Sequence, residues 1–392
     1  MEDACDIVLN TGLRGVTIAD TRICDVDGAN GKLIYRGYLI QDLAEATFEE
    51  VVHLLLYERL PDKTELSGFR ERLAAERNIP EAVIDALKTR PHDALPMDIL
   101  QSAVPMLAHH DSDVKDSSIE SVNRMALRLV ARVATVLAAW NRIRNGETPL
   151  APKLELGHAA NFLYMLTGKE PDEDVGRFMD TALVLHAEHS FNASTFAARE
   201  VASTRAHIYA AVAAAVGSLS GDLHGGANVR VMEMLMKIGD PAKVADFVRQ
   251  EFDAGRVIFG LGHAVYDTDD PRAHILAPMS KVAGERIGEP QWYEISKTLE
   301  DVGKAEFRKR KNRDIYVNVD FYSAALYYAM GIPIDFFTPV FAVSRIAGWV
   351  THVIEEQFAG AAPKPMLYRP ESEYIGDYCG PEECAFVPLD DR

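Results

Sequence analysis

The chain has 392 residues, more than one hydrophobic core usually serves, and 48% of them are hydrophobic, so we expect two globular domains. Its formal net charge of −18 argues against nucleic acid or an anionic membrane as the main partner. Four cysteines in so long a chain suggest a reducing compartment, and the acidic residues 1–6 lack the basic and apolar regions of a signal peptide, so we expect a cytoplasmic protein.

Short strands are expected near the N-terminus. Residues 16–18 and 32–35 are rich in β-branched and aromatic side chains, and the turn-forming sequence Asp-Gly-Ala-Asn-Gly occupies residues 27–31 between them. We therefore expect two strands that are joined through this turn.

From residue 41 onward the sequence has a helical pattern. Apolar residues recur at three- and four-residue spacing, and this spacing predicts helices up to Pro61 and then over residues 65–76, 80–89, 97–107, 118–144 and 154–167. A second helical block spans residues 174–221 and includes the alanine-rich residues 206–219, whose small side chains suit close packing of two helices, within or between subunits. The most apolar helix candidate, residues 125–140, is too short to span a bilayer. Strand patterns are nearly absent after the N-terminal region, so we expect an all-α fold.

The character of the sequence changes between residues 228 and 331. Residues 231–238 and 292–310 have helical patterns, whereas residues 253–270 are rich in loop-forming residues. We expect this section to form a smaller domain set into the larger helical one. An apolar helix is predicted again over residues 341–358.

Two histidines and one acid have the surroundings of an acid–base site. His224 lies in Gly-Asp-Leu-His-Gly-Gly, and His263 lies in Gly-Leu-Gly-His. Glycines let the backbone turn and let another group approach closely, so we expect His224 on an exposed turn between two helices. Asp320 lies in a run of large apolar residues. Two loop histidines and one such acid can together move protons, although a helix C-cap that carries a histidine would also explain His224.

A second pair of histidines, His186 and His189, flanks Glu188. At a spacing of three, both would share one face of a helix, which would suit a metal site. The spacing is not the His-Glu-x-x-His of zinc hydrolases, and Cys379 and Cys384 have no second pair with which to hold zinc. We therefore expect no metal, with His186 in the core and His189 beside a polar seam.

Three arginines and a basic run are candidate anion binders. Arg272 and Arg345 lie among apolar residues, and a buried guanidinium must be paired with a protein acid or with a substrate carboxylate. With Arg369, at the start of an irregular tail, they are candidate clamps for a small polycarboxylate. Residues 308–313 carry five positive charges, which suits a solvated helix end or an anchor for the phosphates of a cofactor. Glycine-rich nucleotide motifs are absent.

Taken together and in order, these motifs resemble one family over nearly the whole chain: the citrate synthases, with the 2-methylcitrate synthases as near relatives. The matching stretches are residues 33–38, 48–51, 186–195, 223–228, 260–272, 318–323, 337–339, 344–345 and 369–370. One departure is Val317, where the family usually has proline. The resemblance implies an all-α fold with a large domain, residues 1–224 and 334–392, and a small domain, residues 225–333, that closes over the substrates.

The resemblance also implies the reaction, an aldol-type condensation of acetyl-CoA with oxaloacetate followed by thioester hydrolysis to citrate and CoA. Asp320 would remove a proton from the acetyl methyl group, His224 would stabilise the enol or enolate, and His263 would give a proton to the ketone of oxaloacetate. A thioester α-proton is too weakly acidic for a free carboxylate to remove, so such fixed donors and acceptors are what the reaction needs. No metal or cofactor is implied beyond the acetyl-CoA substrate.

The residues that bind the two substrates follow from the same resemblance. Arg272, Arg345 and Arg369 would hold the oxaloacetate carboxylates, with His189 as a further donor. Arg369 would come from the partner subunit, so a homodimer is implied. CoA would lie along Val257, Ile258, Gly260 and Gly262 and near Lys311 and Arg313.

Alternative functions come from several classes. A 2-methylcitrate synthase would use propionyl-CoA, and one extra methylene changes binding by only ~1–3 kcal/mol. A citrate-cleaving relative would run the carbon–carbon step in reverse on the same scaffold. A helical dimer that only senses CoA or a dicarboxylate, and a metal-binding protein, are the non-catalytic alternatives.

Overall fold

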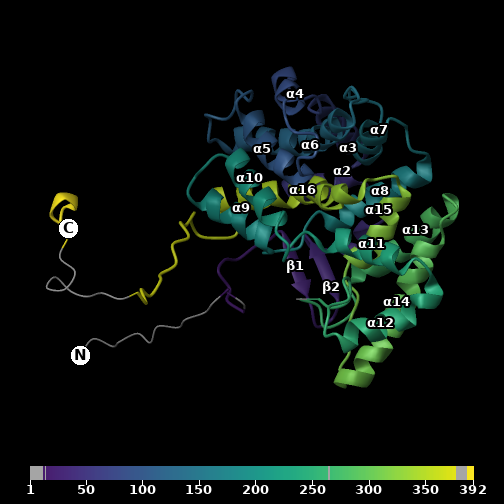
Figure 1. Cartoon of the computed structure of the whole chain (residues 1–392). Helices are drawn as coiled ribbons and strands as arrows, with labels where there is room; N and C mark the ends of the chain where they lie inside the picture. Colours follow the sequence, from purple (N-terminus) through teal and green to yellow (C-terminus); the bar gives the residue numbers. More distant parts are fainter. Residues whose placement is uncertain (1–11, 14, 264, 377–385) are drawn as a thin grey trace.

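A computed structural model describes residues 12–13, 15–263, 265–376 and 386–392 of the chain. Figure 1 shows a large helical body with α2 to α8 toward the top, and a smaller set of helices, including α12 and α14, below it. The fold is all-α apart from a small N-terminal sheet, which confirms the predicted fold class.

The sheet contains three short antiparallel strands, β1 (Cys24–Asp27), β2 (Lys32–Tyr35) and β3 (Tyr38–Leu39), in that order. The strand over residues 32–35 is confirmed, but the strand predicted over residues 16–18 is wrong. A tight turn pairs the strands that flank it directly. The turn at residues 28–31 thus brings Asp27 opposite Lys32, and the same register brings Cys24 opposite Tyr35. Residues 16–18 are left without a partner strand, and their β-branched side chains do not make a strand alone.

The first helical block confirms the predicted elements: α1 (Ile40–Leu43), α2 (Phe48–Tyr57), α3 (Lys63–Ala75), α4 (Glu81–Lys88), α5 (Pro96–Ala108), α6 (Ile119–Arg144) and α7 (His158–Thr167). Capping boxes explain two of the starts, because Thr47 and Asp62 each accept a backbone N–H three residues ahead. Helix α7 begins later than predicted. The carbonyl groups of Lys153 and Leu156 accept hydrogen bonds from the buried Arg77, at 2.7 and 2.8 Å, and this segment is a loop.

The second block contains α8 (Glu173–His186), α9 (Ala193–Ser203) and α10 (Ile208–Leu219). The alanine-rich α10 packs against α9 and α5, so the helix–helix interface is confirmed within the subunit. Gly217 leaves room for the Gln101 side chain, because a Cβ there would lie 2.3 Å from its amide nitrogen. One face of α10, which includes Ala213 and Ala214, is only half-buried. The helix is therefore not enclosed on all sides.

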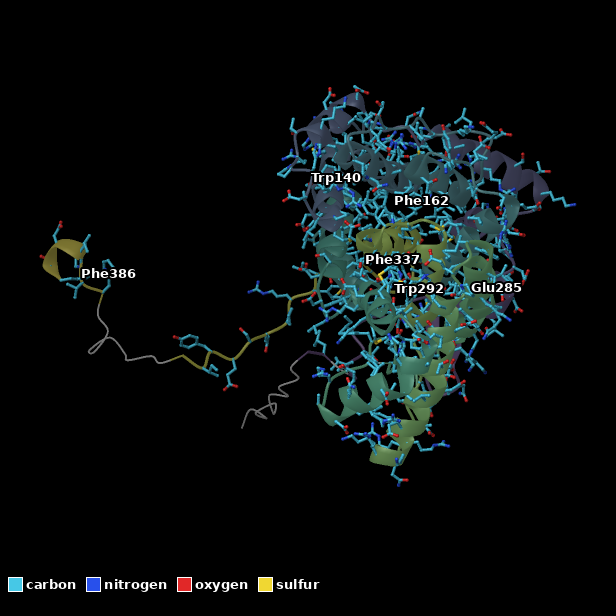
Figure 2. The ribbon with its side chains drawn as sticks, turned by 45° about the vertical axis from the view of Figure 1, so that its right-hand side comes forward. Trp140, Phe162, Glu285, Trp292, Phe337 and Phe386 are labelled. Atoms are coloured by element: carbon cyan, nitrogen blue, oxygen red, sulfur yellow. The ribbon has the colours of Figure 1, made fainter. Side chains whose placement is uncertain are left out.

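Helix α16 (Phe337–Gln357) runs through the middle of the body and contacts α2, α5, α6, α8 and α9. The segment Ile334–Gln357 is long and apolar enough to cross a membrane by length and composition, but 89% of its most apolar window is buried inside the protein. This burial identifies it as the core helix around which the others pack. Phe337, at its start, lies in the middle of the molecule in Figure 2.

The smaller set of helices comprises α11 (Ala227–Ile238), α12 (Val244–Asp253), α13 (Pro271–Arg286), α14 (Gln291–Lys311) and α15 (Asp320–Ala329). They contact one another, α11 with α15, α12 with α14 and α13 with α15. Residues 254–263 and 265–270 form the predicted loop-rich segment. The boundary of a separate domain at residues 225–333 stays a prediction.

After α16 the chain leaves the body as an extended tail (Figures 1 and 2). Its apolar side chains, among them Leu367, Ile375 and Phe386, are exposed. The pair Cys379 and Cys384 lies outside the described residues.

Candidate active site

Six of the predicted site residues gather at one place, from six different segments. His189 follows α8, His224 lies between α10 and α11, His263 lies in the 254–270 loop, Arg272 opens α13, Asp320 opens α15, and Arg345 lies within α16. Arg272 and Arg345 both influence the pKa of Asp320 and of His189, and Arg345 also influences that of His224. The rings of His189 and His263 have centroids 6.0 Å apart.

His224 is held as a neutral imidazole with a defined tautomer. Its Nε2 accepts the backbone N–H of Ser194 at 3.1 Å and also contacts the Ser194 hydroxyl at 2.8 Å. Because a backbone N–H can only donate, Nε2 carries the lone pair and the ring proton lies on Nδ1. Burial, and then the nearby Arg345 charge, lowers the pKa of His224 to about 4. The residue lies on the predicted turn, half-buried rather than exposed.

Ser194 is itself fixed from two sides. Its hydroxyl oxygen lies 2.7 Å from Asn192 Oδ1 and accepts from Trp349 Nε1 at 3.2 Å. Sequence reasoning missed Ser194 as the partner of His224, and Trp349 as a partner of Ser194, although the polar seam beside His189 pointed to this region. The turn also needs Gly225, since a Cβ there would lie 2.2 Å from the Leu219 carbonyl oxygen.

His263 carries its proton on the opposite nitrogen. Its Nδ1 accepts two backbone N–H groups, from Val265 at 2.9 Å and from Tyr266 at 3.1 Å, so the proton lies on Nε2. Nε2 lies 3.4 Å from Oδ2 of the buried Asp270. Gly262, with φ of +100°, makes the bend that allows this arrangement.

Asp270 also binds Arg272 in a bidentate pair, at 2.9 Å to Nε and 2.7 Å to Nη2. Burial alone would raise the pKa of Asp270, but the charge of Arg272 and the hydrogen bond from His263 hold it well below its usual range. Arg272 is therefore paired with a protein acid, which is one of the two kinds of partner that we expected for a buried guanidinium. Asp270 thus orients both a histidine and an arginine of the site.

Arg345 and His189 are the remaining two of the six site residues. Arg345 Nε donates to the His186 carbonyl at 2.7 Å, and its guanidinium lies 4.6 Å from the centre of the Phe341 ring. His189 Nε2 lies 3.2 Å from the Tyr266 hydroxyl. Burial, and then the charge of Arg272, holds the pKa of His189 well below its usual value, so the ring is neutral.

The prediction that His186 and His189 share a helix face is wrong, because α8 ends at His186 and His189 lies in the following loop. His186 Nδ1 donates to the Ala182 carbonyl at 2.8 Å inside the core, as predicted for a core histidine. Within the described parts of the chain, no group of three or more His, Cys, Asp or Glu residues is placed to hold a metal ion.

Asp320 is the first residue of α15 and is half-buried. Burial raises the pKa of its carboxyl to about 6, because desolvation disfavours the charged form. The segment before it pairs with the loop of His263: Gly262 N–H donates to Tyr316 O at 2.7 Å and Asn318 N–H donates to Gly260 O at 3.0 Å. Asp320 and His263 are thereby held on one hydrogen-bonded ribbon.

Val317 stands at the position where the resemblance to the family led us to expect proline. Its backbone N–H donates to Asp269 Oδ1 at 3.0 Å, a bond that proline has no hydrogen to make. Its carbonyl accepts the Asp270 N–H at 3.0 Å. Val317 therefore joins the ribbon to the segment that carries Asp269 and Asp270, directly before α13.

Arg369 is the predicted site residue that lies apart. It is exposed in the tail, and none of the described hydrogen bonds or ion pairs joins it to the six residues of the pocket.

The predicted CoA residues lie on the smaller set of helices. Ile258 is buried and Val257 is 69% exposed. Gly260 and Gly262 lie in the loop before His263, and Lys311 and Arg313 are exposed at the end of α14.

The basic run at residues 308–313 divides into two kinds of residue. Arg308 pairs with Asp314 at 2.5 Å, and Arg310 pairs with Asp253 and Glu306 at 2.6 Å. Lys311 and Arg313 have no ion pair among the residues that the structure describes. Part of the run is thus a solvated, paired helix end, and part of it is unpaired positive charge.

Comparison with known proteins supports these observations. Residues 12–371 match the family model for the citrate synthase C-terminal domain. The chain belongs to the citrate synthase family. It is 42% identical to a citrate synthase of Haloferax volcanii, over 98% of this chain and 99% of that one, and 39% identical to a 2-methylcitrate synthase of Mycobacterium tuberculosis, over 94% and 91%.

A solved citrate synthase of Thermoplasma acidophilum, in ternary complex with carboxymethyl coenzyme A and oxaloacetate, shares the fold, with a TM-score of 0.89 and 30% identity over 98% of this chain and 100% of that one. Citrate synthases are enzymes that condense an acyl-CoA, and the chain is accordingly an enzyme of this class.

Proposed function

We propose that the chain is a citrate synthase that condenses acetyl-CoA with oxaloacetate and hydrolyses the resulting thioester to citrate and CoA. One observation carries the proposal. Two neutral histidines, whose protons are fixed by backbone donors, converge with a carboxyl group of raised pKa beside two buried arginines. That is a set of one base and two hydrogen-bond donors next to a binding site for anions.

In the first step Asp320 removes a proton from the methyl group of acetyl-CoA. Its pKa of about 6 leaves it ionised at neutral pH and a stronger base than an ordinary carboxylate. His224 donates its Nδ1 proton in a hydrogen bond to the thioester oxygen, where negative charge develops. The Ser194 N–H keeps that proton on Nδ1.

In the second step the enolate carbon attacks the ketone carbon of oxaloacetate, and His263 gives its Nε2 proton to the ketone oxygen and regains one when Asp320 releases the methyl proton. The two backbone donors at Nδ1 make Nε2 the proton-bearing atom, and Asp270 orients it. Water then cleaves the citryl thioester, which releases CoA. No metal or cofactor takes part in this scheme.

Arg272 and Arg345, with His189 as a further donor, hold the carboxylates of oxaloacetate. Both guanidinium groups are buried, so the charges attract a small dianion strongly. Residues 225–333 act as the small domain that closes over both substrates and excludes water from the enolate. Residues 1–224 and 334–392 form the large domain, and the enzyme works in the cytoplasm.

Arg369 acts in the pocket of the partner subunit, so the working unit is a homodimer. Mixing Arg369→Ala subunits with His263→Ala subunits is expected to restore part of the activity that each variant lacks, because one site of each heterodimer holds both native residues. The observation behind this is that Arg369 is exposed in the irregular segment after α16, with no described hydrogen bond or ion pair to its own pocket. Subunit exchange is verified by mass spectrometry, and exchange without any recovery of activity would refute the trans role.

CoA lies along residues 257–262, with its phosphates near Lys311 and Arg313. The double variant Lys311→Gln/Arg313→Gln is expected to raise the KM for acetyl-CoA by about 2- to 30-fold, from two exposed contacts of ~0.2–1 kcal/mol each, and the effect should shrink as salt rises. The KM for oxaloacetate should not change. Steady-state kinetics at several ionic strengths measure both.

A matched control for this variant is Arg308→Gln/Arg310→Gln. It removes the same charge from the same helix end, but from side chains that already pair with acids. Its KM for acetyl-CoA should stay close to the wild-type value. If the two double variants raise the KM equally, the total positive charge of the helix end, rather than direct contacts of Lys311 and Arg313, determines the affinity for acetyl-CoA.

The alternative substrate is propionyl-CoA, since a 2-methylcitrate synthase is also among the relatives. Initial rates of free-thiol release with oxaloacetate and either acetyl-CoA or propionyl-CoA test the assignment. A higher kcat/KM for acetyl-CoA supports it, and a higher value for propionyl-CoA makes the chain a 2-methylcitrate synthase. Release of acetyl-CoA from citrate and CoA at a greater rate than condensation would indicate a citrate-cleaving relative.

A further inference from the structure

A buried chain of hydrogen bonds begins directly behind the oxaloacetate pocket. Glu188 Oε1 accepts the backbone N–H of His189 at 2.9 Å and lies 3.1 Å from His352 Nε2. On the other side of that ring, Nδ1 accepts from Arg199 Nη1 at 2.9 Å. A guanidinium only donates, so the proton of His352 lies on Nε2 and points to Glu188. Both Glu188 and His352 are fully buried.

The chain of contacts continues to the base of the tail. Arg199 Nη2 pairs with Glu356 Oε2 at 2.7 Å, and the Tyr368 hydroxyl donates to the same oxygen at 2.8 Å. Tyr368 is also held by its backbone N–H, which donates to Ser203 Oγ at 3.3 Å. The next residue is Arg369, which the proposed function places in the partner's pocket.

Glu188 is also tied electrostatically to the pocket. Burial lowers the pKa of the Arg345 guanidinium. The negative charge of Glu188 raises that pKa, more than any other nearby group does. The carboxylate fits against α16 only because residue 348 is glycine, since a Cβ there would lie 2.1 Å from Glu188 Oε2. The buried Glu188 carboxylate therefore contacts His189 and His352 and also interacts with the charge of Arg345.

We propose that Glu188, His352, Arg199, Glu356 and Tyr368 form a positioning relay that links the oxaloacetate pocket of one subunit to the Arg369 that this subunit lends to its partner. The relay rests on the proposed function, because it needs Arg369 to act in trans. Oxaloacetate that neutralises Arg345 and bonds His189 changes the field and the hydrogen bonds at Glu188. Through the relay this alters how Tyr368 holds the tail, and by linkage the two pockets of a dimer influence each other.

The test is a double-mutant cycle on the full-length dimer, read by calorimetric titration with oxaloacetate. Glu188→Gln and Tyr368→Phe keep side-chain shape and break opposite ends of the relay. Each is expected to raise the Kd by about 3- to 10-fold, and the double variant to be no more than about twofold weaker than the weaker single variant, because coupled residues are not additive. Should Glu188→Gln fail to fold, His352→Gln breaks the same contact and carries the same expectation.

The matched control is Tyr57→Phe, which removes an exposed hydroxyl from α2 and should leave the Kd unchanged. The KM for acetyl-CoA should also stay constant in the relay variants, whereas general structural damage would change both constants and the melting temperature. A double variant whose Kd equals the product of the two single effects overturns the relay alone. A wild-type dimer that binds no oxaloacetate overturns the proposed function and the relay together.

Discussion

Asp320→Asn is expected to lower kcat by about 10²–10⁴-fold, the usual contribution of a positioned general base, while the fold and oxaloacetate binding persist. The amide has nearly the shape of the carboxyl group but cannot accept the methyl proton. Stopped-flow or steady-state thiol release measures kcat, and calorimetry confirms that oxaloacetate still binds. Near-native turnover in this variant would remove Asp320 as the base.

The pH profile gives an independent check on the same residue. Burial raises the pKa of Asp320 to about 6, so its base form is lost as the pH falls through that value. The wild-type kcat should therefore decline on the acid side near pH 6. The pKa of His224 is lowered to about 4, so this ring stays neutral throughout that decline. The residual activity of Asp320→Asn should lack the limb near pH 6.

His224→Gln is expected to lower kcat by about 10²–10³-fold, the typical effect of removing one oxyanion donor. The KM for oxaloacetate should change less than in His263→Gln, because His263 contacts that substrate directly in the proposed scheme. Initial-rate kinetics with both substrates separate the two constants.

Ser194→Ala is the matched control for His224→Gln. It removes the hydroxyl group but retains the backbone N–H that keeps the imidazole proton on Nδ1. Its kcat should fall by less than about tenfold, since one neutral hydrogen bond contributes about 0.5–1.5 kcal/mol. A Ser194→Ala variant as impaired as His224→Gln would mean that the hydroxyl, rather than the N–H, determines the tautomer.

The sequence predicted the helices well where amphipathic spacing is strong, as in α2 and α6. It did not predict α13, where Pro278 interrupts the pattern, and it misplaced a strand at residues 16–18 because strand pairing depends on a partner. His224, His263 and Asp320 stood out because glycines or apolar residues surround them. The partners that fix their protons did not, since Ser194 lies 30 residues from His224 in the chain.

Residues 260–262 and 316–318 are joined as one hydrogen-bonded ribbon, and this ribbon couples the positions of two catalytic groups in the proposed scheme. Its backbone hydrogen bonds link the segments that carry His263 and Asp320, whereas His224 is anchored to Ser194 at the start of α9. Any hinge movement of the smaller helices against the body would therefore carry the base and the acid together as one rigid part. The approach of this part to the imidazole of His224 would then align all three groups in one movement.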